Sequence, residues 1–499
     1  MFPRPRTDLA ANTADFERLP YIKPTGFREY DARWLFPEEI NLMGMQAMGM
    51  GLANLMRLRG VPVRIVTGHD YRSYSGQIKQ ALIVGLLAGG AEVFDIGLAV
   101  TSMAYYAQFE LNVEGVAMVT ASHNDNGWTG IKMGMSRPLT FGPDDMLALK
   151  EIVLGGTYEQ AGGGTYHFVG DVAGRYTADL TDRPKLTRKL KVICACGNGT
   201  AGAFAPQVLE AIGCEVVKLH CDLDYNFPHY NPNPEAMAML HSVSDAVKSH
   251  GADVGLAFDG DGDRCGVVDN EGREIFADRV GVMLARDISS LHPNAKFVVD
   301  VKSTGLFLTD PVLLANNATT AYWKTGHSYI KRYSHETGAL VGFEKSGHFF
   351  FNPPIGRGYD DGLVSGLAVL DMLDRNPGKS MAELERALPK TWQTPTMSPH
   401  CGDEVKYGVV DRVIAHFTGI AEGGGTLAGQ KVRDVNTVNG IRLVLEDGTW
   451  GLVRASSNKP ELVVVVESPT SEANMRAIFA EIDGHLATYP EIGEYNQKI

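Results

Sequence analysis

The sequence lacks both a long apolar run and an excess of positive charge. No apolar stretch reaches the roughly 18 residues that a membrane-spanning helix requires. The opening segment, MFPRPRTDLAANTADFERLP, has no apolar core of the kind that signal peptides contain. The balance of 46 basic against 59 acidic residues gives a net charge of −13, which repels nucleic acid and anionic membranes. We therefore expect a soluble, cytoplasmic protein that binds neither of them.

Cysteine is scarce and scattered. The six cysteines are Cys194, Cys196, Cys214, Cys221, Cys265 and Cys401, and none belongs to a CxxC pair. This spacing predicts neither a zinc site nor a disulfide framework. It fits a reducing compartment.

The chain is too long for one hydrophobic core. Its 499 residues predict three or four domains, and 44% hydrophobic with 21% charged residues is typical of folded proteins. Short apolar runs alternate with amphipathic segments of helical length, which indicates an α/β fold with largely parallel sheets. The expected strands are Arg64–Thr67, Val116–Thr120, Val192–Ala195, Val254–Phe258 and Phe297–Val301.

A weak internal repeat supports several related domains. A helix-like stretch ends at a glycine and continues into a strand at Gly90, Gly213 and Gly338, at nearly equal separations. After about residue 390 the pattern changes to antiparallel strands joined by Asn-Gly and Asp-Gly turns, as in a fourth, α+β domain. The first twenty residues are expected to form an arm or a loose segment.

Two loops that follow buried strands are candidates for catalysis. VAMVTASHNDNGWTGIK (116–132) carries Ser122 and His123 beyond a strand end, where a serine can accept a phosphoryl group and Lys132 could neutralise it. VGLAFDGDGDRCG (254–266) carries Asp259, Asp261 and Asp263, which repel one another unless a hard cation lies among them. Oxygen ligands favour magnesium over zinc. The simpler interpretations are a turn with a helix cap and a structural Asp-Gly turn.

Three further segments carry polar side chains suited to sugars or phosphates. In LVGFEKSGHFFF (340–351), Glu344, Ser346 and His348 alternate as on one face of a strand, either facing a ligand or facing water. VRASSNKPEL (453–462) groups phosphate-oxygen donors, namely Arg454, Ser456, Ser457, Asn458 and Lys459. TGHSYIK (325–331) places His327 and Lys331 on one face if it is helical.

These segments, in this order, resemble the α-D-phosphohexomutases, and most closely the bacterial phosphomannomutase/phosphoglucomutase group. TASHN with Lys132 resembles the phosphoserine loop of that family, DGDGDR its magnesium loop, GFEKSGH its sugar-binding loop, and RASSNKP its phosphate-binding loop. FREYDAR contributes Tyr30 and Arg33. Phe343, Asp125 and the order Ser457-Asn458 depart from the usual family pattern.

The resemblance implies three related mixed α/β domains in series plus a C-terminal α+β domain around a central cleft, with boundaries at 1–170, 171–275, 276–390 and 391–499. It implies a phosphorylated Ser122 that joins Asp259, Asp261 and Asp263 around Mg2+, and catalytic roles for His123, Lys132, Arg33 and His327. The substrate-binding set it implies is Tyr30, Arg264, Lys302, Gly326, Glu344, Ser346, His348, Arg454, Ser456, Ser457 and Asn458.

The implied reaction interconverts hexose 1-phosphate and hexose 6-phosphate, of mannose, glucose or both, through a hexose 1,6-bisphosphate that also serves as activator. The implied enzyme is a monomer or a small homo-oligomer. Phosphoglucosamine mutase is the alternative within the family.

Three alternatives lie outside this family. Gly197, Gly199 and Gly202 spell GxGxxG between a strand and a helix, as in an NAD-dependent dehydrogenase. Asp259 could instead be the nucleophile of a haloacid-dehalogenase-type enzyme, and the chain could be a non-catalytic sugar-phosphate sensor. The dehydrogenase explains none of the anion and metal motifs, and a sensor would not need a phosphoryl carrier.

Overall fold

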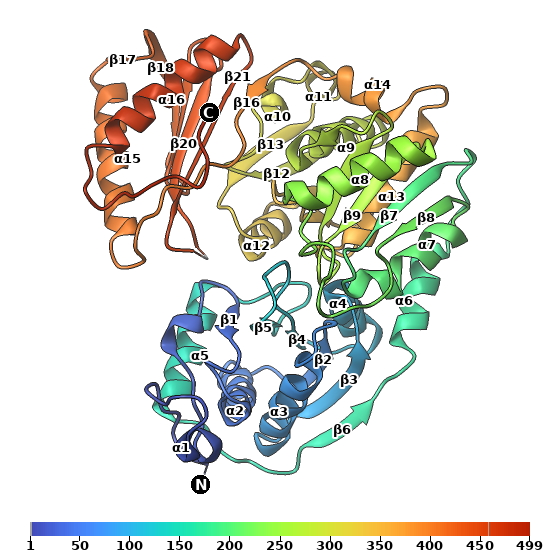
Figure 1. The fold of residues 1–499 in the computed structure, drawn as a ribbon, viewed down its shortest axis with the longest axis vertical. Helices are drawn as coiled ribbons and strands as arrows, with labels where there is room; N and C mark the ends of the chain where they lie inside the picture. Colours follow the sequence, from blue (N-terminus) through green and yellow to red (C-terminus); the bar gives the residue numbers. More distant parts are fainter. Residues whose placement is uncertain (1, 458) are drawn as a thin grey trace. The chain divides into compact units, whose positions relative to one another are not determined.

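The computed structural model describes residues 2–457 and 459–499. The chain divides into two compact units, one made of the residues up to 280 together with 346–382, and the other of 281–345 together with 383–499. None of the helices in the described part of the chain has both the length and the apolar character needed to cross a membrane. The strands form four sheets, which follow one another along the chain (Figure 1).

The first sheet belongs to the N-terminal unit. Its strand order is β1 (Ala32–Leu35), β5 (Trp128–Gly134), β4 (Gly115–Val119), β2 (Arg64–His69), β3 (Glu92–Leu98) and β6 (Thr165–Phe168). The strands from β4 to β6 in that order are parallel, whereas β5 runs antiparallel to β4 and β1. The helices are α1 (Ala14–Arg18), η1 (Pro24–Gly26), α2 (Leu42–Leu58), α3 (Ser75–Ala88), α4 (Thr101–Glu110) and α5 (Pro143–Gly155). A buried apolar core joins this sheet to α2, α3 and α5.

The second sheet lies in the same unit. Its order is β11 (Glu274–Ile275), β10 (Cys265–Asp269), β9 (Val254–Phe258), β7 (Lys191–Ala195) and β8 (Glu215–Leu219). β7 is parallel to β8 and β9, and β10 is antiparallel to β9. The helices are α6 (Val172–Thr181), η2 (Thr200–Ala203), α7 (Ala205–Ala211) and α8 (Met237–His250). The unit also contains β15 (Phe349–Phe351) and α13 (Gly362–Arg375).

The third sheet contains three parallel strands of the other unit. β12 (Lys296–Asp300) lies between β13 (Thr319–Trp323) and β14 (Val341–Phe343). The helices near it in sequence are α10 (Leu306–Thr309), α11 (Pro311–Ala315) and α12 (His327–Thr337). The boundaries between the two units fall within α9 (Ala277–Leu291), between residues 345 and 346 in the turn after β14, and within α14 (Met381–Arg386).

The fourth sheet is antiparallel. Its order is β16 (Trp392–Gln393), β21 (Leu462–Ser468), β20 (Trp450–Ala455), β19 (Ile441–Leu445), β18 (Gln430–Asn436) and β17 (Thr426–Leu427), with helices α15 (Lys406–Glu422) and α16 (Glu472–Leu486). Gly440 and Gly448 have φ of 77° and 89° in the turns on either side of β19. The Asn-Gly and Asp-Gly turns predicted from the sequence are therefore present.

The predicted strands and the internal repeat are confirmed. Each of the five expected strands is present, with its ends displaced by no more than a few residues. Gly90, Gly213 and Gly338 all have positive φ, and each follows a helix and precedes a strand. Glycine adopts this conformation without the steric cost of a Cβ atom. The same helix–glycine–strand turn thus recurs in the first three sheets.

The first twenty residues were expected to form an arm or a loose segment, and they are not loose. α1 lies within it, and Phe16 is buried. The Asn41 side-chain amide donates to the carbonyl oxygens of Phe16 and Leu19 at 2.6 and 2.8 Å, and the Arg6 backbone amide donates to Pro20 at 2.8 Å. These contacts with the first domain hold the segment in place.

Candidate active site

Ser122 lies in a tight loop just after β4. It is 1% exposed, and its φ of 52° falls in the left-handed region that non-glycine residues rarely adopt. The Ser122 amide donates to Thr120 Oγ1 at 2.8 Å, and Arg72 Nη2 donates to the Ser122 carbonyl at 3.1 Å. These bonds offset the conformational cost, as is common where a backbone is held for function.

The acidic loop follows β9 in the second sheet. Asp259, Asp261 and Asp263 are all fully buried. The loop turns through Gly262, whose φ is 74°. A Cβ atom on Gly260 would lie 2.5 Å from the Ser122 carbonyl oxygen, so the acidic loop and the serine loop can approach this closely only because residue 260 is glycine.

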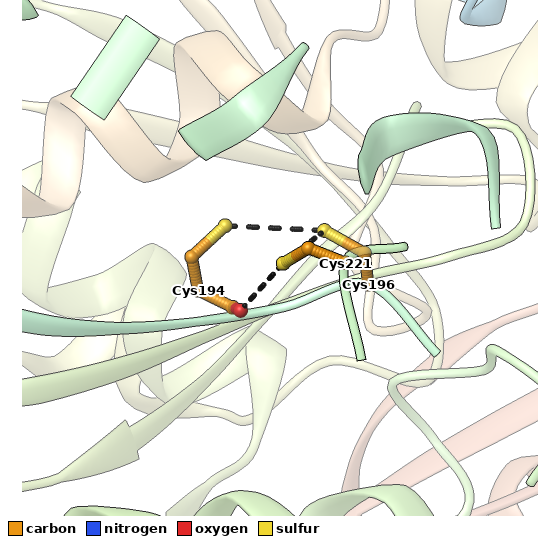
Figure 2. A group of neighbouring side chains, drawn as sticks. All are labelled: Cys194, Cys196 and Cys221. Atoms are coloured by element: carbon orange, nitrogen blue, oxygen red, sulfur yellow. Dashed lines mark hydrogen bonds between the residues drawn. The ribbon is translucent and has the colours of Figure 1, made fainter. Parts of the chain in front are cut away.

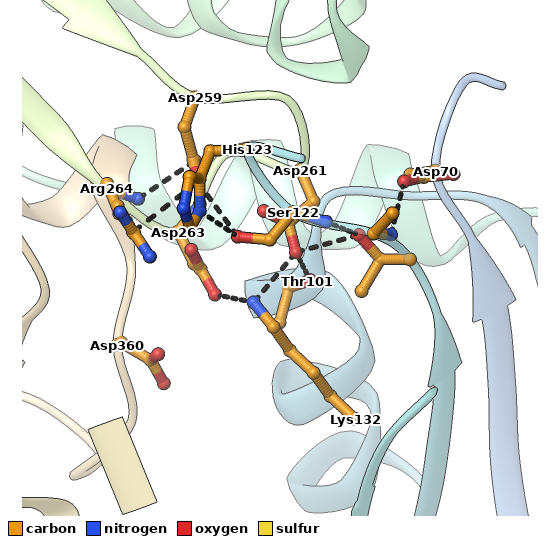
Figure 3. A network of polar contacts seen from close by, with 12 residues as sticks. Asp70, Thr101, Ser122, His123, Lys132, Asp259, Asp261, Asp263, Arg264 and Asp360 are labelled. Carbon is orange, nitrogen blue, oxygen red and sulfur yellow. Dashed lines mark hydrogen bonds and ion pairs between the residues drawn. The ribbon is translucent and has the colours of Figure 1, made fainter. Parts of the chain in front are cut away.

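The two loops bring their side chains together (Figure 3). Ser122 Oγ donates to Asp259 Oδ2 at 3.3 Å, and it lies 3.4 Å from His123 Nδ1. On the other side of the loop, Thr101 Oγ1 donates to Asp261 Oδ2 at 2.6 Å. The hydroxyl that the sequence singles out as a phosphoryl carrier therefore contacts the acidic triplet directly.

Lys132 extends from β5 into the triplet. Its Nζ donates to Asp261 Oδ2 at 2.8 Å and also contacts Asp263 Oδ2. Burial opposes the charge of Lys132, but the carboxylates of Asp261 and Asp263 outweigh it and raise the pKa of the ammonium. The ammonium is therefore protonated at neutral pH.

The pKa values of the carboxyl groups shift in different directions. Burial, followed by the charges of Asp261 and Asp263, raises the pKa of Asp259 well above its usual range. Burial opposes the charge of Asp261 too, but Lys132 lowers its pKa below the usual range. One ammonium thus compensates three carboxylates only in part.

The triplet meets the chemical requirements of a hard divalent cation. One oxygen from each of Asp259, Asp261 and Asp263 lies within 4.8 Å of the others. Asp261 Oδ1 is buried and accepts no hydrogen bond among the described residues. Oxygen ligands of this kind suit magnesium, and a second positive charge would relieve the remaining repulsion.

Arg264 and His348 flank the triplet. Arg264 Nε donates to His348 Nε2 at 2.9 Å and lies 3.7 Å from Asp259 Oδ2. His348 Nδ1 lies 3.0 Å from Asp360 Oδ2 and 3.6 Å from Asp263 Oδ1. Asp360 therefore belongs to this group, although the sequence analysis did not identify it.

Tyr30 and Arg33 lie at the start of the first sheet. Tyr30 is buried, and Arg33 donates from Nε and Nη2 to Asp31 Oδ2 at 3.0 and 2.7 Å. Burial opposes the charge of Arg33, but Asp31, with smaller effects from Asp261 and Asp263, raises its pKa. Arg33 therefore lies within the electrostatic range of the triplet.

Three predicted residues of the other unit follow neighbouring parallel strands. Lys302 comes after β12, Gly326 after β13 and Glu344 after β14, so all three lie at the carboxyl edge of that sheet. The Asp300 carboxylate links their loops, accepting from Thr325 Oγ1 at 3.1 Å and from the Lys345 amide at 3.2 Å. This edge is where parallel α/β sheets bind ligands.

The prediction that alternate polar residues of 340–351 share one face of a strand is wrong. Glu344, Ser346 and His348 lie in the turn between β14 and β15, not along one strand, so the two-residue period does not determine their directions. The two short strands on either side are apolar, and Gly347 turns the chain with φ 95°. In contrast, His327 and Lys331 do lie on one helix, α12, and both are buried.

The predicted phosphate loop follows β20. Arg454 and Ser456 are buried and Ser457 is partly exposed, whereas Asn458 lies outside the described residues. Asn439 Oδ1 accepts from Arg454 Nε at 2.8 Å and from the Thr325 amide at 3.2 Å. Asn439 thus joins this loop to the start of α12. The sequence signals only a turn at Asn439, so its bridging role could not be predicted.

The GxGxxG segment has a structural role. Gly199 lies in the turn before η2, and the Thr200 amide donates to the Gly260 carbonyl at 3.1 Å. The Thr200 hydroxyl accepts from the Tyr71 amide at 2.9 Å. The glycine-rich turn therefore supports the acidic loop, and a bound dinucleotide is not needed to explain its glycines.

The fold and this site define an α/β phosphotransferase with a buried serine beside a carboxylate cluster. Sequence profiles of the four domains described as "Phosphoglucomutase/phosphomannomutase" match residues 24–160 (alpha/beta/alpha domain I), 174–272 (domain II), 276–392 (domain III) and 404–485 (C-terminal domain). The chain thus contains four such domains in series.

Individual proteins match over most of the chain. A phosphomannomutase/phosphoglucomutase of Pseudomonas aeruginosa is 33% identical over 455 residues, covering 91% of this chain and 94% of that protein. A phosphoglucomutase of Neisseria meningitidis serogroup A is 33% identical over 453 residues, covering 90% and 94%. The crystal structure of a phosphoglucomutase/phosphomannomutase family protein from Burkholderia thailandensis matches with a TM-score of 0.84 and 30% identity, covering 95% and 99%. The chain belongs to the phosphoglucomutase/phosphomannomutase family and is a phosphohexomutase.

Proposed function

We propose that Ser122 carries the phosphoryl group that this enzyme exchanges with mannose or glucose phosphates. The observation that carries the proposal is the 3.3 Å contact between Ser122 Oγ and Asp259 Oδ2, inside a fully buried carboxylate triplet. A serine in a strand-end loop needs a compensated site of this kind to hold a phosphate.

The proposed reaction has two transfers. A hydroxyl of the hexose phosphate attacks phosphorus on phosphorylated Ser122, the bond from phosphorus to Oγ breaks, and a hexose 1,6-bisphosphate forms. After the sugar has turned around, Oγ attacks the other phosphate, and the opposite hexose monophosphate leaves. The serine is again phosphorylated, so added hexose 1,6-bisphosphate acts as an activator.

Asp259, Asp261, Asp263 and the phosphorylated Ser122 would hold Mg2+. When bound, this ion would neutralise charge on the transferring phosphoryl group. Lys132 supplies a further positive charge beside Asp261 and Asp263. Its ammonium can donate to a phosphoryl oxygen without a change in protonation.

We assign proton transfer at the sugar hydroxyl to His327. Lys132 and Arg33, the other candidates, have raised pKa values and stay protonated. An imidazole exchanges protons readily near neutral pH. His123, whose Nδ1 lies 3.4 Å from Ser122 Oγ, is the proposed partner of the serine hydroxyl.

The remaining proposed contacts bind the substrate. Glu344 and Ser346 would hold the 3- and 4-hydroxyls, which glucose and mannose share. Arg264 would bind phosphate oxygens, with His348 holding its guanidinium at 2.9 Å. The phosphate that does not react would bind Arg454, Ser456, Ser457 and Asn458, and Tyr30, Lys302 and Gly326 complete the set.

A coupled mutase assay with mannose 1-phosphate, glucose 1-phosphate and glucosamine 1-phosphate, with Mg2+ and hexose 1,6-bisphosphate present, tests the proposal. We expect turnover of the mannose and glucose phosphates to exceed that of the glucosamine phosphate. Ser122→Ala should nearly abolish turnover, whereas the control Ser249→Ala should not change it. Near-normal turnover by the Ser122 variant would overturn the assignment.

Intact-protein mass spectrometry supplies a second readout. Incubation with hexose 1,6-bisphosphate should add one acid-stable phosphoryl group, located at Ser122. Release of that group by hydroxylamine would point instead to an aspartyl phosphate, as expected if Asp259 were the nucleophile.

The domain boundaries at residues 170, 275 and 390, a cytoplasmic location and a monomeric or small homo-oligomeric state complete the proposal.

A further inference from the structure

Three cysteines that take no part in the proposed reaction meet at the carboxyl edge of the second sheet (Figure 2). Cys194 is near the end of β7, Cys196 directly follows that strand, and Cys221 follows the neighbouring parallel strand β8. Alternate residues of an extended chain point to the same side, which directs Cys194 and Cys196 together. The connection from β7 to the parallel strand β8 then places Cys221 next to them.

The spacing of the sulfur atoms is that of metal ligands. Cys196 Sγ lies 3.9 Å from Cys194 Sγ and 3.6 Å from Cys221 Sγ, and all three atoms lie within 4.8 Å of one another. A zinc–sulfur bond of about 2.3 Å in a tetrahedral site separates neighbouring sulfur atoms by about 3.8 Å. The cysteines are not joined by disulfide bonds.

We propose that Cys194, Cys196 and Cys221 bind a thiophilic d10 cation, zinc or copper(I), at a site separate from the carboxylate triplet. Three sulfur ligands leave one position of a zinc site open to water, and they suffice for three-coordinate copper(I). Thiolates select soft cations, whereas carboxylates select magnesium. The two sites therefore do not compete for one ion.

The burial of the cysteines fits such a site. Cys194 and Cys196 are fully buried, while Cys221 is partly exposed and opens a path for the ion. Cys221 Sγ donates to the Cys194 carbonyl oxygen at 3.1 Å and to Cys196 Sγ at 3.6 Å, so the three residues already pack against one another. Buried cysteines often serve only as small apolar side chains, but that role does not require three sulfur atoms within 4.8 Å of one another.

The site adjoins the turn that supports the acidic loop. The Cys196 carbonyl accepts from the Gly199 amide at 2.8 Å, and the next amide, of Thr200, donates to Gly260 at 3.1 Å. A cation held by Cys194, Cys196 and Cys221 would fix the ends of β7 and β8 beside this turn. Its binding should therefore raise the midpoint of thermal unfolding.

Titration of the reduced full-length chain with Cd2+, in excess Mg2+ and without oxygen, tests the site. We expect a thiolate-to-metal absorption band that saturates at one equivalent, and added Zn2+ should displace the Cd2+. Copper(I), supplied with a competing chelator, forms the second arm and decides between the two cations. Cys221→Ser should lose the band, whereas Cys214→Ser should keep it, because Cys214 is a buried cysteine just before β8 and outside the cluster.

X-ray absorption of the zinc-loaded chain provides a readout that does not depend on a variant folding. We expect about three sulfur neighbours at about 2.3 Å. A shell of oxygen and nitrogen alone, an unchanged band in Cys221→Ser, or absence of the band at one equivalent would each overturn the proposal. A reduced protein that binds neither cation but forms a Cys196–Cys221 disulfide on oxidation would also overturn it. Retained mutase activity in Cys221→Ser would show that the variant is folded and that this site is distinct from the active site.

Discussion

At the scale of single residues, the site depends on charges buried at high density. Asp259, Asp261 and Asp263 are fully buried, and Lys132 is the ammonium that contacts two of them. Such a group is stable only while each charge keeps its partner, because removing one partner leaves another charge buried and uncompensated. Lys132 thus contributes to folding as well as to the proposed chemistry.

Lys132→Met should destabilise the chain most when Mg2+ is absent. Loss of one partner from a buried ionic group costs about 3–5 kcal/mol, and Mg2+ bound to the triplet would restore part of that charge compensation. Urea unfolding followed with and without Mg2+ measures the difference. The control Lys185→Met changes an exposed lysine and should have little effect. An equal loss in both conditions would show that Lys132 does not compensate the triplet.

Asp361 gives a pH-dependent stability. Burial raises the pKa of its carboxyl to about 7, even though Tyr176 Oη donates to it at 2.7 Å. The unfolded carboxyl titrates near 4, so the folded state binds more protons between these values and loses stability as pH rises through the folded pKa. The total loss is up to about 4 kcal/mol.

Asp361→Asn should remove this loss, because an amide can still accept from the Leu363 and Val364 amides at the start of α13. We expect the unfolding midpoint of the variant to change less between pH 5.5 and 8 than that of the parent chain. Asp182→Asn, at an exposed position, provides the control. Parallel pH profiles for Asp361→Asn and the parent would contradict the raised pKa.

The residue pattern alone favoured the acidic triplet as a site, because glycine-separated acids after an apolar run have few structural explanations. A simple turn explained the Ser122 loop equally well, so the selection of Ser122 and Lys132 depended on the family resemblance. Asp360 and Thr101 could not be selected. The role of Thr101 comes from a chain crossing that brings it to Asp261, 160 positions further on, with a 2.6 Å bond. Asp360 joins the group because the chain folds back to place it 3.0 Å from His348 Nδ1.

At the scale of elements, local signals predicted strands and hairpins better than turns. The Asn-Gly and Asp-Gly pairs define the hairpins around β19 because glycine supplies the positive φ they require. The pattern of residues 344–348 predicted a strand wrongly, since Glu-x-Ser-x-His has the two-residue period of a strand but lies in a turn. Gly347, with positive φ, was the one signal of that turn.

Helix α15 contains two glycines that weaken it. Gly408 and Gly419 are exposed, and a Cβ atom added to either would have no neighbour within 4 Å. Replacing both with alanine should therefore stabilise α15, by about 0.5–1 kcal/mol each, through reduced freedom of the unfolded chain. Thermal unfolding measures the rise in midpoint.

Gly338→Ala is the matched control, in which the same substitution should destabilise the chain. A Cβ there would also meet open space, but the φ of 65° at the end of α12 disfavours any side chain. This variant should unfold at a lower temperature than the parent, by about 1–2 kcal/mol of stability. A stabilising effect would mean that α12 ends in another conformation.

At the scale of the whole molecule, the two compact units should respond differently to metal. The triplet lies within the unit that holds residues 254–266, while 281–345 and 383–499 form the other. An ion that binds only the folded state stabilises it, by about 2.7 kcal/mol at a hundred times its dissociation constant.

Removal of Mg2+ by EDTA should abolish turnover and lower the midpoint of one calorimetric transition. Limited proteolysis during heating identifies the unit that opens first, which we expect to be the one with the triplet. Addition of Mg2+ should restore both properties. A shift confined to the transition of the other unit would place the ion elsewhere.

The fold class of the whole chain was the feature best predicted from the sequence. The arrangement of its loops was the feature least well predicted. Alternating apolar and amphipathic segments indicate α/β domains, and the repeat at Gly90, Gly213 and Gly338 reflects their common plan. The contacts of the N-terminal segment and of Asn439 depend on tertiary packing. No local pattern encodes such contacts.

The close approach of Gly260 to the Ser122 carbonyl limits which substitutions this sequence can accept. A methyl group there would separate the two loops, and one at Gly262 would strike Val100. In a library in which every position is varied and variants are selected for growth on the enzyme's substrate, under conditions in which growth requires the product, positions 260 and 262 should return glycine alone. Two residues with no side chain would then rank among the least replaceable in the enzyme.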